Sequence, residues 1–533
     1  MPPDPQPTRR RAELAIALAA GVVATVLAYS PYRVPGLGIV MLAPIAFLLD
    51  AATPRRAFAL AWLYSVVFGA WLVRWVVHAL AEYEVAALPA WIFTSIVVFG
   101  LALVPATAGA AYAALRPRLR SAAAPLAFAA LWTLGEWVRG ALLGMPWLLA
   151  AQTVTRWPIA IQGADFGGQY AVSFVLLAIG GGIGIAARRR SGLALVAPFA
   201  IAALWLAYGA ARLATGTPGD APRLRVGIVQ ASVPQGERFQ DPSSAARNLA
   251  RHETATRELA ARDPLDLVIW SETAVDTDLD LTPAIRARLE RLAAEIGVPI
   301  VTGAPRTRDG RHFNAVVLVA PDGGVAESYD KQRLVPFSEY DPALGGLLTP
   351  LIGPVVAGAP YAAGTKATVF RAVAIPFATP ICFEITDPAL VRRFRAAGAQ
   401  LLVNLSNDAW FGRIGYPEMH FDHAIFRAVE TRMPVLRGAN TGISGVVDAA
   451  GRVGAEIPAF EAGTLRVEVA AAGPPPLYAR TGDAPLVVAL LLVIAITARS
   501  APKGAAPGSR RRRSGRRRPA AAPPAAPAAT STR

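Results

Sequence analysis

The sequence has a single cysteine, Cys382, in 533 residues. One thiol cannot form an intrachain disulfide, and it cannot supply a cysteine-rich zinc site. Three roles stay open for Cys382: a small buried hydrophobic residue, one half of an intermolecular disulfide, or a nucleophile. An apolar run ends at Cys382, Glu384 follows two residues later, and turn-forming residues 386–388 come next. This pattern is typical of a strand that turns into a helix, where backbone N–H groups can serve a reacting atom.

Charged residues are also scarce. They make up 17% of the chain against 54% hydrophobic residues, and the mean hydropathy of +0.39 excludes an ordinary soluble protein of this length. Runs long enough to cross a bilayer lie at 12–29, 36–52, 57–79, 89–115, 122–143, 165–187 and 192–214. A shorter run at 484–498 can be extended by its flanks. The sequence therefore predicts a polytopic α-helical membrane bundle of eight spans, seven in a domain at 12–214 and the eighth at 482–499.

Arginines between these runs predict the orientation of the spans. Clusters at 9–11, 55–56, 116–120 and 188–190 fall on one side if the spans alternate, and positive charge marks the cytoplasmic side. Both termini are then expected in the cytoplasm, 1–11 as a basic segment and 500–533 as a disordered basic tail. The region after the seventh span lies outside. A cleaved signal peptide at the first run is an alternative that leaves this outside placement unchanged.

The net charge of +16 does not by itself indicate nucleic acid. Residues 499–533 carry ten basic side chains and no acidic one, so the tail accounts for most of the excess. A basic tail beside a membrane span favours attraction to a lipid surface, and we expect no nucleic-acid partner.

Residues 223–478 have the composition of a soluble domain in which β-rich and helical stretches alternate. This alternation indicates α/β layers with functional sites at strand ends. The predicted strands are 224–230, 267–270, 299–303, 315–320, 368–373, 377–382, 401–405, 435–439 and 445–448. The predicted helices are 243–261, 282–296, 389–397 and 417–431.

Three predicted strand ends in this domain carry reactive groups: Glu272, Lys331 and Cys382. Taken alone, Glu272 could cap a helix and Lys331 could be an ordinary surface charge. Together, a carboxylate, an ammonium group and the only thiol suit acyl transfer. A thiol needs a base or a cation to react near neutral pH, and a lysine offsets the charge on the oxygen of a tetrahedral intermediate.

The motifs Trp270-Ser271-Glu272, Tyr329-Asp330-Lys331 and Cys382-Phe383-Glu384 resemble the Glu-Lys-Cys triad of the nitrilase, or carbon–nitrogen hydrolase, superfamily. This resemblance implies a nitrilase-like αββα sandwich of four layers. Two longer stretches, KQRLVPFSE at 331–339 and NLSNDAWFG at 404–412, resemble the apolipoprotein N-acyltransferase family. A nitrilase-like domain between seven spans and an eighth is also similar to that family.

The resemblance implies a ping-pong reaction at a Cys thioester. Cys382 would attack the sn-1 ester of a phospholipid, Glu272 would move the protons, and Lys331 with a backbone N–H near Phe383 would hold the oxyanion. The acceptor would be the α-amino group of the diacylglyceryl-cysteine of an apolipoprotein, in the last step of lipoprotein maturation. The implied location is a bacterial inner membrane with a periplasmic catalytic domain, without cofactor or metal.

Further residues are assigned supporting or substrate-binding roles. Glu339 and Glu384 match family glutamates near the triad, and Phe383 stands where a tyrosine is common, which removes a hydroxyl beside the nucleophile. Aromatic or polar side chains that could contact the lipid substrates are Trp410, Phe411, Asn407, Glu136, Arg139 and Trp147. Glu136 and Arg139, three residues apart, can pair inside the bundle, and structural pairing or snorkelling is an equally valid explanation for them.

Other functions stay open. A membrane-tethered carbon–nitrogen hydrolase, or amidase, would release the acyl group to water after the same first half-reaction. A non-enzymatic lipid-binding scaffold would carry a degenerate domain that has lost its reactive groups. The presence of all three triad residues argues against this alternative. Glu418, His420 and His423 lie close in sequence, but without further ligands they favour a polar helix face over a metal site. We expect a monomer.

Overall fold

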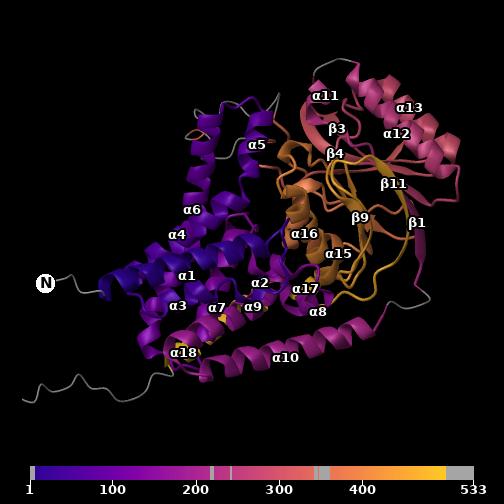
Figure 1. Ribbon diagram of the computed structural model, residues 1–533. Coiled ribbons are helices and arrows are strands. Elements are labelled where there is room, and N and C mark those ends of the chain that lie inside the picture. The colour runs from indigo at the N-terminus through magenta and orange to yellow at the C-terminus, as the bar shows by residue number, and fades with distance from the viewer. Residues whose placement is uncertain are drawn as a thin grey trace, which may run out of the picture.

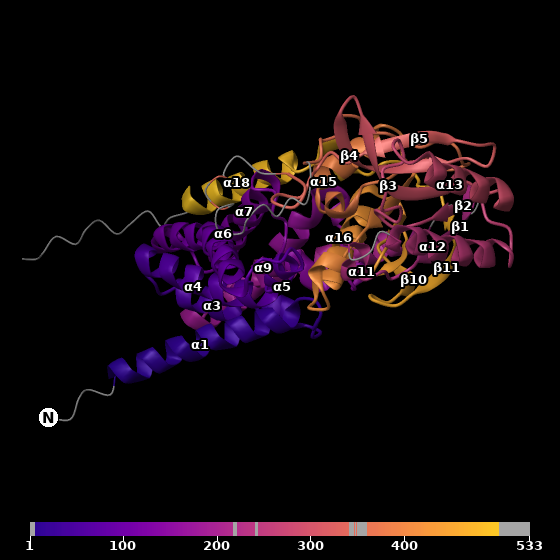
Figure 2. The same ribbon diagram turned by 90° about the horizontal axis from the view of Figure 1, so that it is seen from above.

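The computed structural model describes residues 6–216, 221–239, 243–340, 346, 348 and 360–499. Residues 1–5 and the predicted tail 500–533 therefore lie outside the described residues. The described chain forms a helical bundle beside a domain built from two β-sheets (Figure 1). Both views place the two parts side by side, and the C-terminal helix α18 returns to lie against α7 of the bundle (Figure 2).

Each predicted span coincides with one helix or with a broken pair of helices. The bundle helices are α1 (Gln6–Ala28), α2 (Leu37–Val40), α3 (Ala43–Leu49), α4 (Pro54–Leu72), α5 (Trp75–Glu82), α6 (Ala87–Leu115), α7 (Ala124–Trp137), α8 (Pro158–Ile161), α9 (Ala164–Arg189), α10 (Leu193–Ala214) and α18 (Ala484–Arg499). Short turns η1 (Arg116–Arg118), η2 (Val138–Leu142) and η3 (Ala150–Val154) connect them.

The number of complete spans is supported only in part. Within the described residues, three helices are long and apolar enough to cross a membrane, at 87–118, 164–189 and 193–214. A fourth span results if α4 and α5, bent by 47°, count as one. The helices at 12–28, 37–49 and 484–499 are apolar but shorter. The apolar runs alone therefore overestimated the length of continuous helix, because several runs contain breaks.

The outer surface of the bundle is apolar. Large hydrophobic side chains on several helices are strongly exposed, among them Leu88 at 71%, Leu204 at 74% and Ile496 at 61%. Apolar exposure on this scale would be unfavourable in water and is expected for helices that face lipid.

A buried carboxylate ties several helices together at one end of the bundle. Asp50 follows α3 and accepts hydrogen bonds from Tyr112 of α6 at 2.6 Å and from Arg189 of α9 at 2.7 and 2.8 Å. Arg116 donates to the carbonyl oxygen of Asp50. Arg116, which follows α6, and Arg189, the last residue of α9, therefore meet at the same end of the bundle.

The soluble part is a sandwich of two sheets. One sheet has six strands in the order β11-β1-β2-β3-β4-β5, and the other has five in the order β10-β9-β8-β7-β6. The strands are β1 (Arg223–Gln230), β2 (Leu267–Ile269), β3 (Ile300–Arg308), β4 (Arg311–Val319), β5 (Val325–Asp330), β6 (Phe377–Ala378), β7 (Leu401–Ser406), β8 (Val435–Ala439), β9 (Ser444–Val447), β10 (Val453–Ile457) and β11 (Gly463–Ala470).

Helices cover the outer faces of both sheets. Those of the soluble part are α11 (Gln235–Phe239), α12 (Ser244–Ala260), α13 (Pro283–Ile296), α15 (Pro388–Ala396), α16 (Tyr416–Thr431) and α17 (Leu477–Thr481), with short turns η4 (Cys382–Thr386) and η5 (Ala409–Phe411). α12 contacts β1 and α13 contacts β4, while α16 contacts β8 and β9. The four layers are those of the expected nitrilase-like αββα sandwich.

Two strand predictions were wrong in this domain. Residues 368–373 form no regular strand, and only an isolated bridge joins Phe370 to Phe377. The run 377–382 is a strand only at β6, because the chain turns into η4 at Cys382. Strands β10 and β11 were not predicted, and β5 was predicted only by its end before Lys331. All three strands are largely exposed or only partly buried, so they lack the continuous apolar runs of the buried strands.

The two-sheet sandwich docks on the bundle through α16, which lies between the two parts (Figure 1). Asp422 of α16 is buried and accepts hydrogen bonds from Ser30 at 2.6 Å, Arg33 at 2.8 Å and Thr155 at 2.8 Å. All three donors come from segments that connect the bundle helices. The bundle and the sandwich therefore share a polar contact at the end of the bundle away from Asp50.

Candidate active site

The three reactive groups predicted from the sequence lie at one edge of the sandwich. Glu272 follows β2, Lys331 follows β5, and Cys382 begins η4 shortly after β6. Gly303 allows β3 to pass Glu272, because a Cβ at this glycine would lie 2.7 Å from Cα of Glu272. Cys382 has φ of 49°, a left-handed conformation that is uncommon for a residue with a side chain and typical of strained functional turns.

Lys331 is the central charge of the site. Its side chain is 1% exposed, and Nζ donates to Glu272 Oε1 at 3.1 Å and to Glu339 Oε1 at 2.9 Å. Burial lowers the pKa of Lys331, but the combined effect of the two carboxylates, which raise it, is larger. The pKa of Lys331 therefore lies well above its ordinary value. An ammonium group has three donors. Two are used here, which leaves one N–H for a substrate oxygen.

Glu272 has a single accepting position left. Oε1 accepts from Lys331 and from Asn314 Nδ2 at 2.8 Å, and Oε2 accepts from the backbone N–H of Asn407 at 2.8 Å. A carboxylate offers about four lone-pair sites, two on each oxygen. The remaining site on Oε2 can take a proton from a neighbouring group such as the Cys382 thiol.

Asn314 and Glu339 complete the support of the lysine. Nδ2 of Asn314 also donates to Glu339 Oε1 at 2.8 Å, and Glu339 Oε2 accepts from the backbone N–H of Val335 at 2.7 Å. The amide of Asn314, on β4, therefore bridges the two carboxylates on either side of Lys331. Sequence reasoning missed Asn314, because no local motif connects it to Glu272.

Glu384 joins the lysine segment to the cysteine segment. Its carboxylate accepts from the Tyr329 hydroxyl at 2.9 Å and from the backbone N–H groups of Gln332 at 2.6 Å, Arg333 at 2.9 Å and Ile381 at 2.8 Å. Burial raises the pKa of Glu384 to about 7, against the opposing effect of these N–H groups. This side chain therefore holds the turn after β5 against the turn that presents the thiol.

Cys382 is 5% exposed, and its pKa is raised above the ordinary value of a thiol, which favours the neutral form. Burial raises the pKa of the thiol most strongly, and the Glu272 carboxylate raises it further. The Lys331 ammonium group lowers it, but by less than the other two effects raise it. The thiol therefore has to lose its proton to a base as it attacks, and Glu272, the carboxylate that raises the pKa of the thiol most, has an accepting position for that proton.

A second group of polar side chains lies next to the thiol. The Cys382 sulfur, a carboxylate oxygen of Asp408 and a ring nitrogen of His420 lie within 4.8 Å of one another. Arg437 Nη2 lies 3.0 Å from His420 Nδ1 and 2.8 Å from Asp408 Oδ2, so a guanidinium group already neutralises the carboxylate. The positive charge of Arg437 opposes a metal ion at this position. The sequence pointed to His420 only as part of a helix face with Glu418 and His423.

The aromatic candidates lie where the bundle meets the site. Trp410 stacks on Tyr83 of the bundle with ring centroids 4.3 Å apart, and Phe411 stacks on Tyr416 at 3.7 Å. Trp147 lies 4.9 Å from the ring of His423. Trp147 and Tyr416 belong to one apolar cluster, and Phe383, which is half-buried, packs against this cluster. Asn407 is 4% exposed and lies inside the site, where its backbone contacts Glu272.

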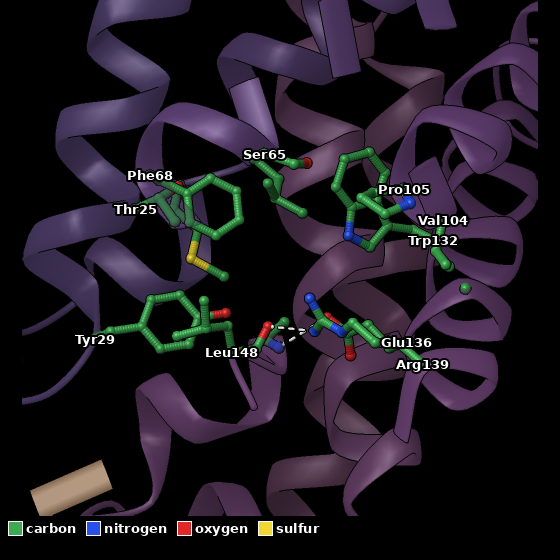
Figure 3. A pocket seen from close by; sticks show the side chains of 14 residues that line it. Thr25, Tyr29, Ser65, Phe68, Val104, Pro105, Trp132, Glu136, Arg139 and Leu148 are labelled. Carbon is green, nitrogen blue, oxygen red and sulfur yellow. Dashed lines mark hydrogen bonds between the residues drawn. The ribbon is translucent and has the colours of Figure 1, made fainter. Parts of the chain in front are cut away.

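Glu136 and Arg139 lie inside the bundle rather than at the triad. They line a cavity with Tyr29, Phe68 and Trp132 (Figure 3). Arg139 donates to the carbonyl oxygen of Leu148 at 2.9 Å, and Glu136 accepts from the backbone N–H of Ala150 at 2.9 Å. Among the described residues no ion pair within 4.0 Å joins the two side chains, so the expected direct pairing is replaced by contacts to the backbone after η2.

Two family models match the chain. Residues 20–182 match the apolipoprotein N-acyltransferase N-terminal domain, and residues 225–473 match the carbon-nitrogen hydrolase domain. The apolipoprotein N-acyltransferase of Geobacter metallireducens is 32% identical over 492 residues, which cover 89% of this chain and 92% of that protein. That of Azotobacter vinelandii is 33% identical over 474 residues, covering 85% and 88%. A solved amidase from Nesterenkonia sp. aligns with 51% of this chain and 98% of its own at 20% identity and a TM-score of 0.38.

The αββα sandwich, its thiol, carboxylate and ammonium group, and the matching domain model define an enzyme of the carbon–nitrogen hydrolase class joined to an apolar helical bundle. The length and identity of the matches on both parts decide the family. The chain belongs to the apolipoprotein N-acyltransferase family and is an acyltransferase.

The protonation state of Cys382 predicts its reactivity toward iodoacetamide. Because its pKa is raised, we expect the alkylation rate of the folded protein to rise about tenfold per pH unit from pH 7 to 9 without reaching a plateau. The unfolded protein, with an ordinary thiol pKa near 8.5, should level off above about pH 9. Glu272→Gln removes a carboxylate that raises the pKa and should speed alkylation at pH 8. A plateau below pH 7 in the folded protein would contradict a neutral resting thiol.

Proposed function

We propose that the protein transfers an acyl chain from the sn-1 position of a phospholipid to the α-amino group of the diacylglyceryl-cysteine of an apolipoprotein, through a thioester on Cys382. Lipoprotein and phospholipid are the substrates that membership of the family implies. The site supports this assignment, because it contains the nucleophile, the base and the cation that acyl transfer requires.

In the first half-reaction, the Cys382 sulfur forms a bond to the ester carbonyl carbon while its proton passes to Glu272. The carbonyl oxygen becomes an oxyanion, which the third N–H of Lys331 and the backbone N–H of Phe383 stabilise. Collapse of this intermediate breaks the ester C–O bond. The glycerol oxygen takes the proton from Glu272 and leaves as a lysophospholipid.

In the second half-reaction, the α-amino group of the lipoprotein attacks the thioester carbonyl. Glu272 accepts a proton from the attacking nitrogen, and the same two donors stabilise the second oxyanion. Breaking the C–S bond then releases the amide, and the departing sulfur regains its proton from Glu272. The enzyme returns to its starting state, as a ping-pong mechanism requires.

One observation carries the choice of lipid substrates: a single apolar cluster connects the bundle to the catalytic turn. Phe383, which follows Cys382 in the chain, and Phe411 pack against the cluster that contains Trp147 of the bundle. This cluster extends to Tyr29 and Met41 at the cavity of Figure 3. An acyl chain held at Cys382 can therefore extend along side chains of the bundle without entering water. The proposed substrate contacts of Trp410, Phe411, Asn407 and Trp147 follow from this arrangement, with Glu136 and Arg139 at its far end.

We further infer eight spans, cytoplasmic termini and a periplasmic catalytic domain in a bacterial inner membrane. Helix α9 supports this orientation. Near its start, the backbone N–H of Gln169 donates to Glu430 of the catalytic domain at 2.8 Å, and at its end Arg189 binds Asp50. These positions are 20 residues apart, roughly 30 Å of helix and about the thickness of the hydrocarbon core. The arginine-rich end then faces the cytoplasm.

A monomer suffices for the reaction, because all groups of the site come from one chain.

The thioester is tested with a phospholipid that carries a labelled sn-1 chain. We expect the purified protein in detergent to acquire a label that neutral hydroxylamine removes, because hydroxylamine cleaves thioesters. Cys382→Ala should acquire none. Adding a diacylated lipopeptide should then move the label to the peptide amine. Label that persists in Cys382→Ala would contradict the proposed nucleophile, and release as free fatty acid in the presence of lipopeptide would indicate a hydrolase instead.

The orientation is tested with single cysteines introduced into Cys382→Ala. Asp322 lies in an exposed turn after β4, and Arg120 lies exposed after η1 at the opposite end. A membrane-impermeant maleimide should label Asp322→Cys in intact spheroplasts, but Arg120→Cys only after permeabilisation. The reverse labelling pattern would invert the proposed topology.

A further inference from the structure

His420 holds the backbone of the nucleophile directly. The residue lies on α16, is fully buried, and places Nε2 3.1 Å from the carbonyl oxygen of Cys382. Cys382 is the residue with φ of 49°, so its peptide group is oriented by contacts that compensate an unfavourable conformation. The reaction steps above assign no role to His420.

The hydrogen-bond partners of the ring determine where its proton lies. A carbonyl oxygen only accepts, so Nε2 must carry a hydrogen for the contact with Cys382 to be attractive. Without that hydrogen, two lone pairs would face each other at 3.1 Å. The Nε2 proton is therefore present whether the ring as a whole is neutral or charged.

The other side of the ring faces a fixed charge pair. Arg437 Nη2 has two N–H groups, one directed to Asp408 Oδ2 at 2.8 Å and one available to His420 Nδ1 at 3.0 Å. Asp408 Oδ1, 3.0 Å from the same nitrogen, accepts from the Ser406 hydroxyl at 2.7 Å. Burial and Arg437 lower the pKa of His420 against the opposing effect of Asp408, and the lower pKa favours the neutral ring, in which Nδ1 accepts from Arg437.

We propose that His420 is a positioning residue that aligns the oxyanion donor: its Nε2–H fixes the carbonyl of Cys382, and Arg437, which donates to Nδ1, holds the ring in the required tautomer. The carbonyl of Cys382 and the N–H of Phe383 belong to one planar trans peptide group, in which the two bonds point in opposite directions. Fixing the carbonyl toward α16 therefore directs the Phe383 N–H away from α16. This inference rests on the proposed function, in which that N–H binds the oxyanion.

The geometry distinguishes this role from that of a general base. A His base would need a free lone pair directed at the thiol, as in a Cys-His-Asp arrangement. Here Nε2 is occupied by the Cys382 carbonyl, and Nδ1 faces Arg437 and Asp408. His420 thus acts on the reaction through the backbone of the nucleophile, while Glu272 keeps the open accepting position.

Two amide substitutions separate the two ring nitrogens. The side-chain nitrogen of His420→Gln can take the place of Nε2 and donate to Cys382, whereas that of His420→Asn lies at the position of Nδ1 and cannot reach the carbonyl. In single-turnover thioester formation from a labelled phospholipid, we expect His420→Asn to lose about 10²-fold, as for loss of one oxyanion donor. His420→Gln should stay within about tenfold of wild type. Half-saturating phospholipid concentration should be unchanged in both.

The outcomes are distinct for the inference and for the function. Wild-type rates in both variants, or equal losses in both with equally lowered melting temperatures, would overturn the positioning role. Absence of any thioester on the wild-type protein would instead overturn the proposed function. Better retention of rate by His420→Asn than by His420→Gln would also contradict the inference, because it would assign the effect to the contact at Nδ1.

A second measurement is made on the wild-type protein. The chain has five histidines, so ¹⁵N-labelled histidine in the full-length protein in detergent gives few signals. We expect the His420 signal, assigned by its loss in His420→Gln, to show a protonated Nε2 throughout pH 6 to 9. A His420 with Nε2 unprotonated at pH 8 would overturn the proposal.

Discussion

The site depends on a buried ammonium group between two carboxylates. Lys331, 1% exposed, could not remain charged in this environment without Glu272 and Glu339, and neither carboxylate would be stable there without the lysine. Asn314 bridges the same two oxygens, so four groups from separate segments form one network. This network determines the chemistry: it leaves one donor on Lys331 and one acceptor position on Glu272, both next to a neutral thiol.

The remaining structure joins that network to the apolar bundle. Glu384 and the turn at Cys382 place the thiol, and α16 lies behind them while it also contacts the bundle through Asp422. The bundle supplies an apolar outer surface and an inner cluster that reaches Phe383. A soluble acyl-transfer site would need neither. The two-part architecture is therefore explained by substrates that reside in a membrane.

The sequence predicted those features that local patterns encode. Alternating strands and helices indicated α/β layers, the resemblance to the nitrilase superfamily implied the sandwich, and the unique cysteine with Glu272 and Lys331 at strand ends indicated the reactive groups. Contacts between distant segments could not be predicted, because Asn314 lies 42 residues from Glu272 and His420 lies 38 residues from Cys382. Apolar runs located the bundle helices but not the break between α2 and α3 or the bend between α4 and α5. Strands β10 and β11, partly exposed, carried too weak a pattern.

The most direct test of the central claim removes the charge of Lys331 while keeping the balance of charge around it. Lys331→Met alone leaves two buried carboxylates uncompensated, so Lys331→Met combined with Glu339→Gln serves as the variant that should fold, and Glu339→Gln alone is its control. In single-turnover acylation by a labelled phospholipid, the account predicts a loss of about 10²-fold to 10³-fold for the double variant relative to Glu339→Gln. Equal rates for the two proteins would show that the lysine does not stabilise the oxyanion.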